Sequence, residues 1–368
     1  MFDRKLTQNF NWVLMGLTVA LAIIGVMMVY SAVTAGPDDV QKGLVFKQII
    51  WFASGFLMVL FLILVDYRSL EPWSNLIYVF CLCLLIFVFL IGKTAGGSRR
   101  WIELGFFSIQ PSELMKIAII ITLARYYAKR ITIGGLTLRN LFKPILIVAV
   151  PVVLILKQPD LGTAILLVLV AASVTLFAKI ERRSLIYLTA SGVVCAPLIW
   201  FFLKDYQKQR ILTFLNPDRD PLGTGYHIIQ SKIAIGSGMI HGKGFLKGTQ
   251  NALSFLPEQH TDFIFSVLAE EWGFLGAGVL LILLALIIIL GINVAHSCRD
   301  PFGILLSVGL AVLIFWETLI NIGMVMGLMP VVGVPLPFIS YGGSSVLAKM
   351  ICVGLLLNIG MRRHILQN

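Results

Sequence analysis

Residues 10–33 read FNWVLMGLTVALAIIGVMMVYSAV and contain no charged side chain. An α-helix rises about 1.5 Å per residue, so a run of this length can cross the roughly 30 Å of hydrocarbon in a bilayer. Arg4 and Lys5 precede the run as in a signal peptide, but the run is too long for the apolar region of such a peptide. The sequence therefore predicts an uncleaved first membrane span at 11–33.

Apolar stretches of similar length recur along the 368 residues, of which 58% are hydrophobic and only 13% are charged. A soluble domain is about half apolar and about a quarter charged, so this composition indicates a chain that lives in lipid. We expect an all-α polytopic membrane protein with ten transmembrane helices, and we treat residues 1–368 as a single membrane domain. Pro159 should end the fifth helix before the sixth begins. The predicted spans are 11–33, 45–65, 73–92, 112–128, 141–157, 161–178, 185–203, 263–291, 302–328 and 342–361.

Basic residues are distributed unequally over the loops between these spans. Ten spans place both termini on the same side of the membrane, and most lysines and arginines of the short loops lie on that side. Such loops are retained in the cytoplasm, so both termini are predicted to be cytoplasmic. The formal net charge of +11 has the same explanation, together with binding to anionic membrane lipid. No nucleic acid partner is expected, because the basic residues form no continuous stripe.

The connection 204–262 between the seventh and eighth spans differs from all the others in length. By the count of basic residues it lies outside the cell, and it combines apolar stretches with many glycines. A helix-like segment at 226–235 suggests that this large extracytoplasmic loop folds back on the membrane surface. Loops of such length usually have a function, although a solvated insertion that only caps the bundle remains an alternative.

Several ionisable residues are predicted at the outer face, and each has a structural alternative. Asp262 lies where the long loop enters the eighth span, and Asp160 lies between the fifth and sixth spans, where it could simply cap a helix. Glu113 and Lys116 are three residues apart, and therefore on one face of the fourth helix, where they could pair with each other. Two arginines precede that helix and could be interfacial anchors, namely Arg99 and Arg100.

Other charged residues lie deeper, inside the apolar spans. A charge in hydrocarbon costs a few kcal/mol or more unless it is paired or hydrated. We therefore predict that Lys349 pairs with Glu317 or with one of the adjacent residues Glu270 and Glu271. A purely structural role, in which these residues hold the helices together without touching a substrate, is the favoured interpretation.

The outer face limits the chemistry that such residues can perform. The sequence contains no phosphate-binding loop and no zinc motif, and its five histidines and five cysteines have no metal-ligand spacing. A transferase outside the cell needs a donor that arrives already activated in the membrane, and a lipid pyrophosphate meets this need. Arginine, lysine or a divalent cation would stabilise the leaving pyrophosphate, and a carboxylate such as Asp262 could accept the proton of an attacking hydroxyl.

Five motifs then occur in one order along nearly the whole chain. They are GSRRWI at 97–102, QPSELMK at 110–116, QPDLGT at 158–163, LPEQHTDFIF at 256–265 and PLPFISYGGSS at 335–345. In these motifs the sequence resembles the SEDS family (shape, elongation, division and sporulation), which includes RodA, FtsW and SpoVE. The segments GYHIIQSKIAIGSG at 225–238 and GTQ at 248–250 are most similar to the RodA branch.

The resemblance implies a peptidoglycan glycosyltransferase in the bacterial cytoplasmic (inner) membrane. Such an enzyme polymerises lipid II into a lipid-linked glycan strand on the outer face during cell elongation, and it releases undecaprenyl pyrophosphate. It works with a class B penicillin-binding protein, which is a transpeptidase, and with other rod-shape elongation proteins. Carried onto this sequence, the resemblance implies that Asp262 is the catalytic base and that Glu113, Lys116 and Asp160 support the same outer cavity.

Several basic residues could bind the pyrophosphate. Arg99, Arg100, Arg210 and Lys116 are all candidates, and their spacing does not rank them. A divalent cation, Mg²⁺ or Mn²⁺, would suit the same charge, although no cluster of metal ligands is visible in the sequence. Two other functions are compatible with an outer polar site, namely a lipid II flippase and a scaffold that recruits a synthase. Clustering of the polar residues at one face favours catalysis.

Overall fold

The computed structural model describes residues 9–34, 43–95, 98–104, 107–130, 135–220, 223–253 and 258–362. Each of the ten apolar stretches coincides with one helix, and most of the ends differ from the predicted ones by only a few residues. The helices are α2 (Trp12–Thr34), α3 (Gly43–Leu64), α4 (Leu70–Ile91), α5 (Pro111–Ala128), α6 (Leu138–Lys157), α7 (Leu161–Phe177), α8 (Arg182–Phe202), α12 (Ile264–Ser297), α13 (Pro301–Val325) and α14 (Gly343–Arg362).

Helix length and hydropathy support a multi-pass membrane protein. Among the described residues, seven helices are long and apolar enough to cross a membrane. Two of the remaining predicted spans deviate for visible reasons, because α7 has only 17 residues and α5 carries Glu113, Lys116 and Arg125 within its 18 residues. The all-α polytopic fold is therefore confirmed, and the number of ten crossings stays a prediction.

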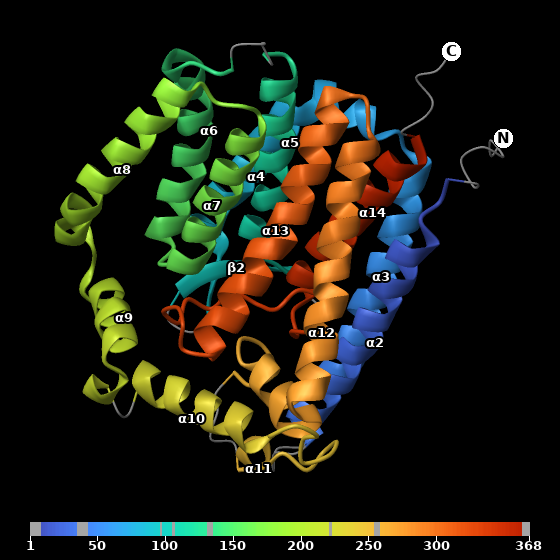
Figure 1. Ribbon diagram of the computed structural model, residues 1–368, viewed down its shortest axis with the longest axis vertical. Coiled ribbons are helices and arrows are strands. Elements are labelled where there is room, and N and C mark those ends of the chain that lie inside the picture. Colours follow the sequence, from blue (N-terminus) through green and yellow to red (C-terminus); the bar gives the residue numbers. More distant parts are fainter. Residues whose placement is uncertain are drawn as a thin grey trace.

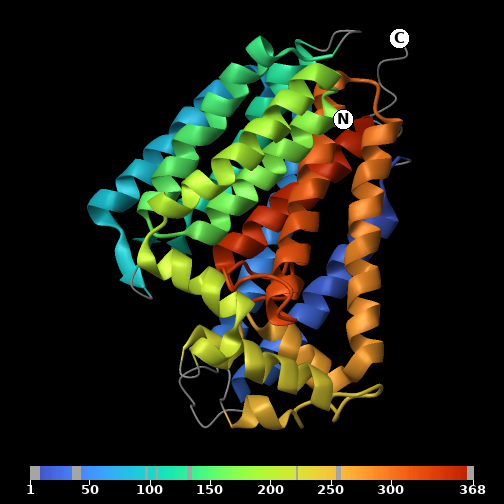
Figure 2. The ribbon, with the colours of Figure 1, turned by 60° about the vertical axis from the view of Figure 1, so that its left-hand side comes forward.

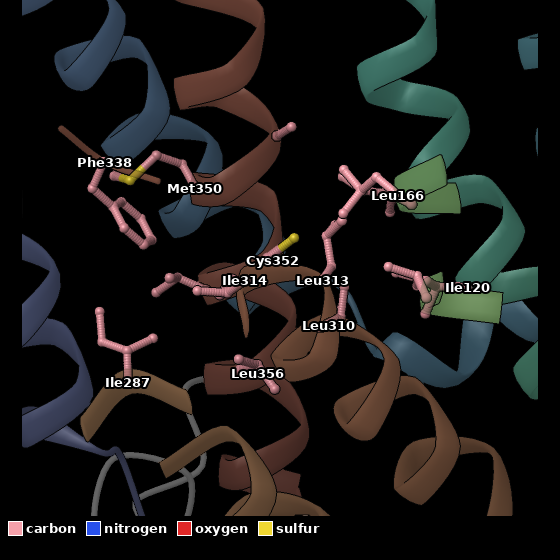
Figure 3. Packing of buried hydrophobic residues seen from close by; sticks show 14 of the residues in the cluster. Ile120, Leu166, Ile287, Leu310, Leu313, Ile314, Phe338, Met350, Cys352 and Leu356 are labelled. Atoms are coloured by element: carbon pink, nitrogen blue, oxygen red, sulfur yellow. The ribbon is translucent and has the colours of Figure 1, made fainter. Parts of the chain in front are cut away.

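The core is built around α13 and α14, most of whose residues are buried. Helix α13 packs against α5, α7 and α12, and α14 packs against α3 and α5. Leu310 and Leu313 of α13 lie between Ile120 of α5 and Leu356 of α14 in the buried cluster (Figure 3). Because α13 and α14 contact helices from different parts of the chain, polar residues on those helices can meet in the core.

One end of the bundle carries most of the non-spanning structure (Figures 1 and 2). The long connection forms α9 (Asp205–Leu215), the short 3₁₀ helix η3 (Pro217–Arg219), α10 (Thr224–Ser237) and α11 (Thr249–Ala252), so the helix expected at 226–235 is confirmed. The start of α2 and the end of α14 lie at the opposite end (Figure 1). A small antiparallel sheet, which the sequence did not predict, precedes α5 and consists of β1 (Lys93–Ala95), β2 (Ser98–Leu104) and β3 (Phe107–Ile109).

Helix α12 is broken at Gly273, whose φ of 64° and ψ of −163° are accessible to glycine alone. The chain after α10 fills this break, since the backbone N–H of Phe274 donates to the carbonyl of Met239 at 2.8 Å. Gly242 lies so close that a Cβ there would meet the carbonyl oxygen of Glu271 at 2.1 Å. At this break the long connection is therefore hydrogen-bonded to α12. The short part of α12 before the break begins beside Asp262.

Candidate active site

Asp262 lies in the turn just before α12, and neighbouring segments fix its backbone. The side-chain amide of Asn321 in α13 donates to the carbonyl of Asp262 at 2.9 Å. The preceding residues are bound to the segment before α14, because Ser340 Oγ donates to the carbonyl of Thr261 at 2.6 Å and Tyr341 N–H donates to that of His260 at 2.9 Å. The carboxylate thus lies on a turn that α13 and the segment before α14 hold in place.

The Asp262 carboxylate is half-buried and accepts no hydrogen bond from any residue that the structure describes. It faces Gly333, where a Cβ would lie 3.2 Å from Asp262 Oδ2. Burial and the negative charge of Glu258 raise the pKa of Asp262 to about 6, although the positive charge of Arg210 opposes this rise. A carboxylate that is not engaged by the protein, with a pKa close to neutrality, is suited to act as a general base.

The pKa of Asp262 is also affected by the charges of three further residues, namely Arg100, Asp160 and Arg210. Arg100 in β2 lies 3.5 Å from the Asp160 carboxylate through Nη1, and its other nitrogens donate to the carbonyls of Gln158 and Pro159. Asp160 also caps α7, because Thr163 N–H donates to its Oδ1 at 3.1 Å, as the capping alternative predicted. The structure thus gathers residues from β2, α7, α9 and the start of α12.

The four candidate pyrophosphate ligands are now distinguishable. Arg210 in α9 has no ion-pair partner among the described residues, and burial together with the charge of Arg100 lowers its pKa. Arg99 precedes Arg100 in strand β2, so its side chain points to the opposite face and is exposed. Lys116 forms ion pairs with Glu113 and Glu317. The cations whose charges act on Asp262 are therefore Arg210 and Arg100.

Glu113 and Lys116 belong to a second cluster, a buried network of four charges. Lys116 Nζ lies 2.7 Å from Glu113 and 2.6 Å from Glu317 of α13. Lys349 of α14 lies 2.8 Å from Glu317 and 3.3 Å from Glu113. All four side chains are almost completely buried, so each lysine bridges both glutamates and the charges cancel. Their role in supporting the outer cavity stays a prediction, since their charged groups point at one another.

The network confirms the predicted pairing of Lys349 with Glu317 and of Glu113 with Lys116. The other acidic partners considered for Lys349 lie elsewhere. Glu270 is bound to Lys243 Nζ at 2.6 Å and accepts the backbone N–H groups of Thr249 and Gln250, while Glu271 accepts a hydrogen bond from Ser31 of α2. That Glu113 also contacts Lys349 was missed, because sequence spacing does not say that α5 and α14 meet.

Asn321, Ser340 and Gly333 were not identified as site residues from the sequence. A signal existed, because Asn321 is an isolated amide within an apolar span and Ser340 belongs to the PLPFISYGGSS motif. Among the described residues, no group of three His, Cys, Asp or Glu side chains is placed to hold a metal ion. The site therefore consists of one unengaged carboxylate with two nearby arginines.

Fold and site together define a polytopic helical membrane protein with a carboxylate–arginine site at the end of its bundle that carries α9 to α11. Residues 11–365 match the family model described as cell cycle protein, FtsW, RodA and SpoVE, and the chain belongs to this family. This is the family that the sequence motifs resemble.

Individual relatives agree over nearly the full length. Peptidoglycan glycosyltransferase MrdB of Escherichia coli is 40% identical over 350 residues, which covers 94% of each chain. A chain from a structure described as structural coordination of polymerization and crosslinking by a peptidoglycan synthase complex superposes with a TM-score of 0.82, at 31% identity over 98% of this chain and 99% of that one. The rod shape determining protein RodA of Thermus thermophilus gives a TM-score of 0.71 at 28% identity, with coverages of 96% and 98%.

Proposed function

We propose that this chain is a peptidoglycan glycosyltransferase that polymerises lipid II on the outer face of the bacterial cytoplasmic membrane during cell elongation. Family membership and the relative named peptidoglycan glycosyltransferase support the activity. Resemblance to the RodA structure supports a role in elongation. The observation that carries the catalytic assignment is the unengaged Asp262 carboxylate, whose pKa is raised to about 6 beside two arginines.

Asp262 acts as the general base in this proposal. Its carboxylate accepts the proton from the 4-hydroxyl of the acceptor GlcNAc, and that oxygen forms a bond to the anomeric carbon of the donor MurNAc. The bond from this carbon to the pyrophosphate oxygen breaks, so undecaprenyl pyrophosphate leaves with the electron pair and the configuration inverts. Arg210 and Arg100 stabilise the negative charge that develops on the leaving group. Stabilisation of developing charge is usually the largest single contribution to catalysis.

Asp160 and the buried network have supporting roles in the proposal. Asp160 orients Arg100 by a direct ion pair while it caps α7. Glu113 and Lys116 join α5 to α13 and α14 through Glu317 and Lys349, so they stabilise the bundle beneath the site. A divalent cation, Mg²⁺ or Mn²⁺, would bind through pyrophosphate oxygens and at most one or two carboxylates. No step proposed here depends on that cation.

The proposed setting follows from the same assignment. Residues 1–368 form a single membrane domain, the 204–262 connection lies outside the cell and both termini are cytoplasmic. The proposed partner is a class B penicillin-binding protein that cross-links the strand, together with other rod-shape elongation proteins. A related chain in a peptidoglycan synthase complex that coordinates polymerization and crosslinking supports this partnership.

Polymerisation of lipid II by purified protein tests the proposal. Wild type, Asp262→Ala and Asp262→Asn would be reconstituted in nanodiscs with the cognate penicillin-binding protein, after equal folding and equal partner binding are established. Glu258→Gln is the matched control, because it removes a neighbouring exposed carboxylate in the same turn. We expect polymer from the wild type and from the control only.

Other results would reject parts of the proposal. Equal polymer from Asp262→Ala and wild type would remove Asp262 from catalysis. Absence of polymer from wild type, combined with transfer of lipid II between leaflets, would establish the flippase instead. Absence of both activities would leave the scaffold.

A further inference from the structure

Asn321 lies in α13, far from Asp262 in the sequence, and its side chain is completely buried at 0% exposure. Its single amide nitrogen donates twice, to the carbonyl of Asp262 at 2.9 Å and to the carbonyl of Val334 at 2.8 Å. One side-chain group therefore ties together the turn before α12 and the segment between α13 and α14. A buried carbonyl left without a donor costs about 1–3 kcal/mol, so both contacts favour this arrangement.

One of the two segments that Asn321 joins carries Asp262, and the other lies against the Asp262 carboxylate. Gly333 precedes Val334, and its position lies against Asp262 Oδ2, with 3.2 Å between that oxygen and a Cβ placed on Gly333. Its φ of 72° lies in the left-handed region, which favours glycine. The Asn321 side-chain amide thus holds the backbone of Asp262 close to the Gly333 segment.

We propose that Asn321 is a positioning residue of the active site, which holds the Asp262 carboxylate against the Gly333 segment in the geometry for proton abstraction. This inference rests on the proposed function of Asp262 as general base. Asn321 touches the backbone of Asp262 and not its carboxylate, so it acts through placement of the base. Misplacing a catalytic group by about 1 Å can cost roughly a hundredfold in rate.

A separate set of contacts keeps the turn folded when Asn321 is changed. Ser340 Oγ donates to Thr261 and accepts the backbone N–H of Leu336 at 2.8 Å, and Tyr341 donates to His260 through its backbone. None of these contacts involves the Asn321 side chain. Replacement of Asn321 should therefore loosen the position of Asp262 without unfolding the turn.

The test compares Asn321→Leu with the wild type in the lipid II polymerisation assay across pH 5 to 8. Leucine has a similar shape and removes both N–H donors. We expect kcat to fall by about tenfold to a hundredfold, with KM for lipid II changed less than threefold. The midpoint of the rising limb should also move to lower pH, because a carboxylate released from Gly333 is better solvated.

The pH profile belongs to Asp262 only if its charged neighbours are accounted for. The groups whose charges act on it are Glu258 in its own turn, Asp160 at the start of α7, Arg100 in β2 and Arg210 in α9. His260, two residues before Asp262, is the other titratable group of this turn. None of these groups contacts the Asn321 side chain among the described residues. Asn321→Leu leaves their charges in place, so a shifted midpoint reports movement of Asp262.

Asn358→Leu is the matched control. Asn358 is also 0% exposed, lies in α14 near the other end of the bundle, and donates its side-chain amide to the carbonyls of Leu62 and Val65. We expect this control to lower thermal stability while leaving the pH midpoint and kcat per folded molecule unchanged. A purely structural function of Asn321 would give the same pattern in Asn321→Leu, and that result would overturn the proposal.

Two variants distinguish a wrong general base from a wrong positioning residue. If Asp262→Asn keeps polymerising, the general base is misassigned and the positioning function falls with it. If Asp262→Asn is inactive but Asn321→Leu retains wild-type kcat and the wild-type midpoint, only the positioning function is wrong.

Discussion

Glu258 and Arg210 act on the Asp262 carboxylate in opposite directions. Burial is the largest cause of its raised pKa of about 6, Glu258 adds to the rise, and Arg210 opposes it. A general base works in its deprotonated form, so its rate rises with pH through its pKa and levels off above it. The charged groups around Asp262 can therefore set the pH range in which the site works.

We predict that polymerisation by the wild type rises between about pH 5 and pH 7, with a midpoint near the Asp262 pKa of about 6. Glu258→Gln should move the midpoint to lower pH, because it removes a negative charge that disfavours the carboxylate. Arg210→Gln should move it to higher pH and also lower kcat. Initial rates in nanodiscs across this range measure both shifts, with exposed Arg219→Gln in η3 as the control for charge. Movement of both midpoints in one direction would contradict the assignment.

At the scale of elements, the buried network joins three helices by charge. Glu113 and Lys116 come from α5, Glu317 from α13 and Lys349 from α14. Apolar helix surfaces alone do not fix how two helices are placed in a bilayer, because lipid tails are as apolar as those surfaces. Four ion pairs that require one relative placement of these helices give the bundle a defined register.

Lys349→Ala should destabilise the protein by about 3–5 kcal/mol, because it leaves the network with one uncompensated negative charge in the core. Adding Glu317→Gln should restore part of the loss, since Glu113 and Lys116 remain a neutral pair at 2.7 Å. Thermal unfolding of the two single variants and the double variant in detergent measures the coupling. Strictly additive losses would contradict a shared network.

Helix α12 provides a second prediction at this scale. Gly242 has a φ of 79°, and a Cβ there would lie 2.1 Å from the carbonyl oxygen of Glu271. Gly242→Ala should therefore cost about 1–3 kcal/mol and release the chain that fills the break at Gly273. Faster hydrogen exchange at 239–250 would report this release. Gly236→Ala in α10 is the matched control, because a Cβ there meets nothing within 4 Å. Equal exchange in both variants would contradict the predicted close packing.

At the scale of the whole molecule, the proposed orientation can be tested by labelling. His241, after α10, and Lys129, after α5, are both exposed. In intact cells, His241→Cys should react with a membrane-impermeant thiol reagent, while Lys129→Cys should react only after the cells are permeabilised. The unsubstituted chain, which has an exposed Cys83, gives the background. The opposite labelling pattern would reverse the orientation derived from the basic residues.

Much of this architecture could be predicted from the sequence, because long apolar runs can satisfy their backbone only as helices in lipid. Pairing of Glu113 with Lys116 followed from helical spacing, and the burial cost of Lys349 implied a partner. The break at Gly273 was missed, since a glycine in an apolar run gives no sign of its φ. Asn321 was missed because its importance lies in which two carbonyls it meets, and that depends on the packing of α12, α13 and α14.

The buried network also has an electrical consequence. A membrane potential of 100 mV does about 2.3 kcal/mol of work on each elementary charge that crosses it. Two lysines and two glutamates within 3.3 Å of their partners carry no net charge. Any joint displacement of these four side chains along the membrane normal would therefore move almost no net charge through the field. Because its charges cancel, the network itself adds almost no dependence on the membrane potential to the energy of such a movement.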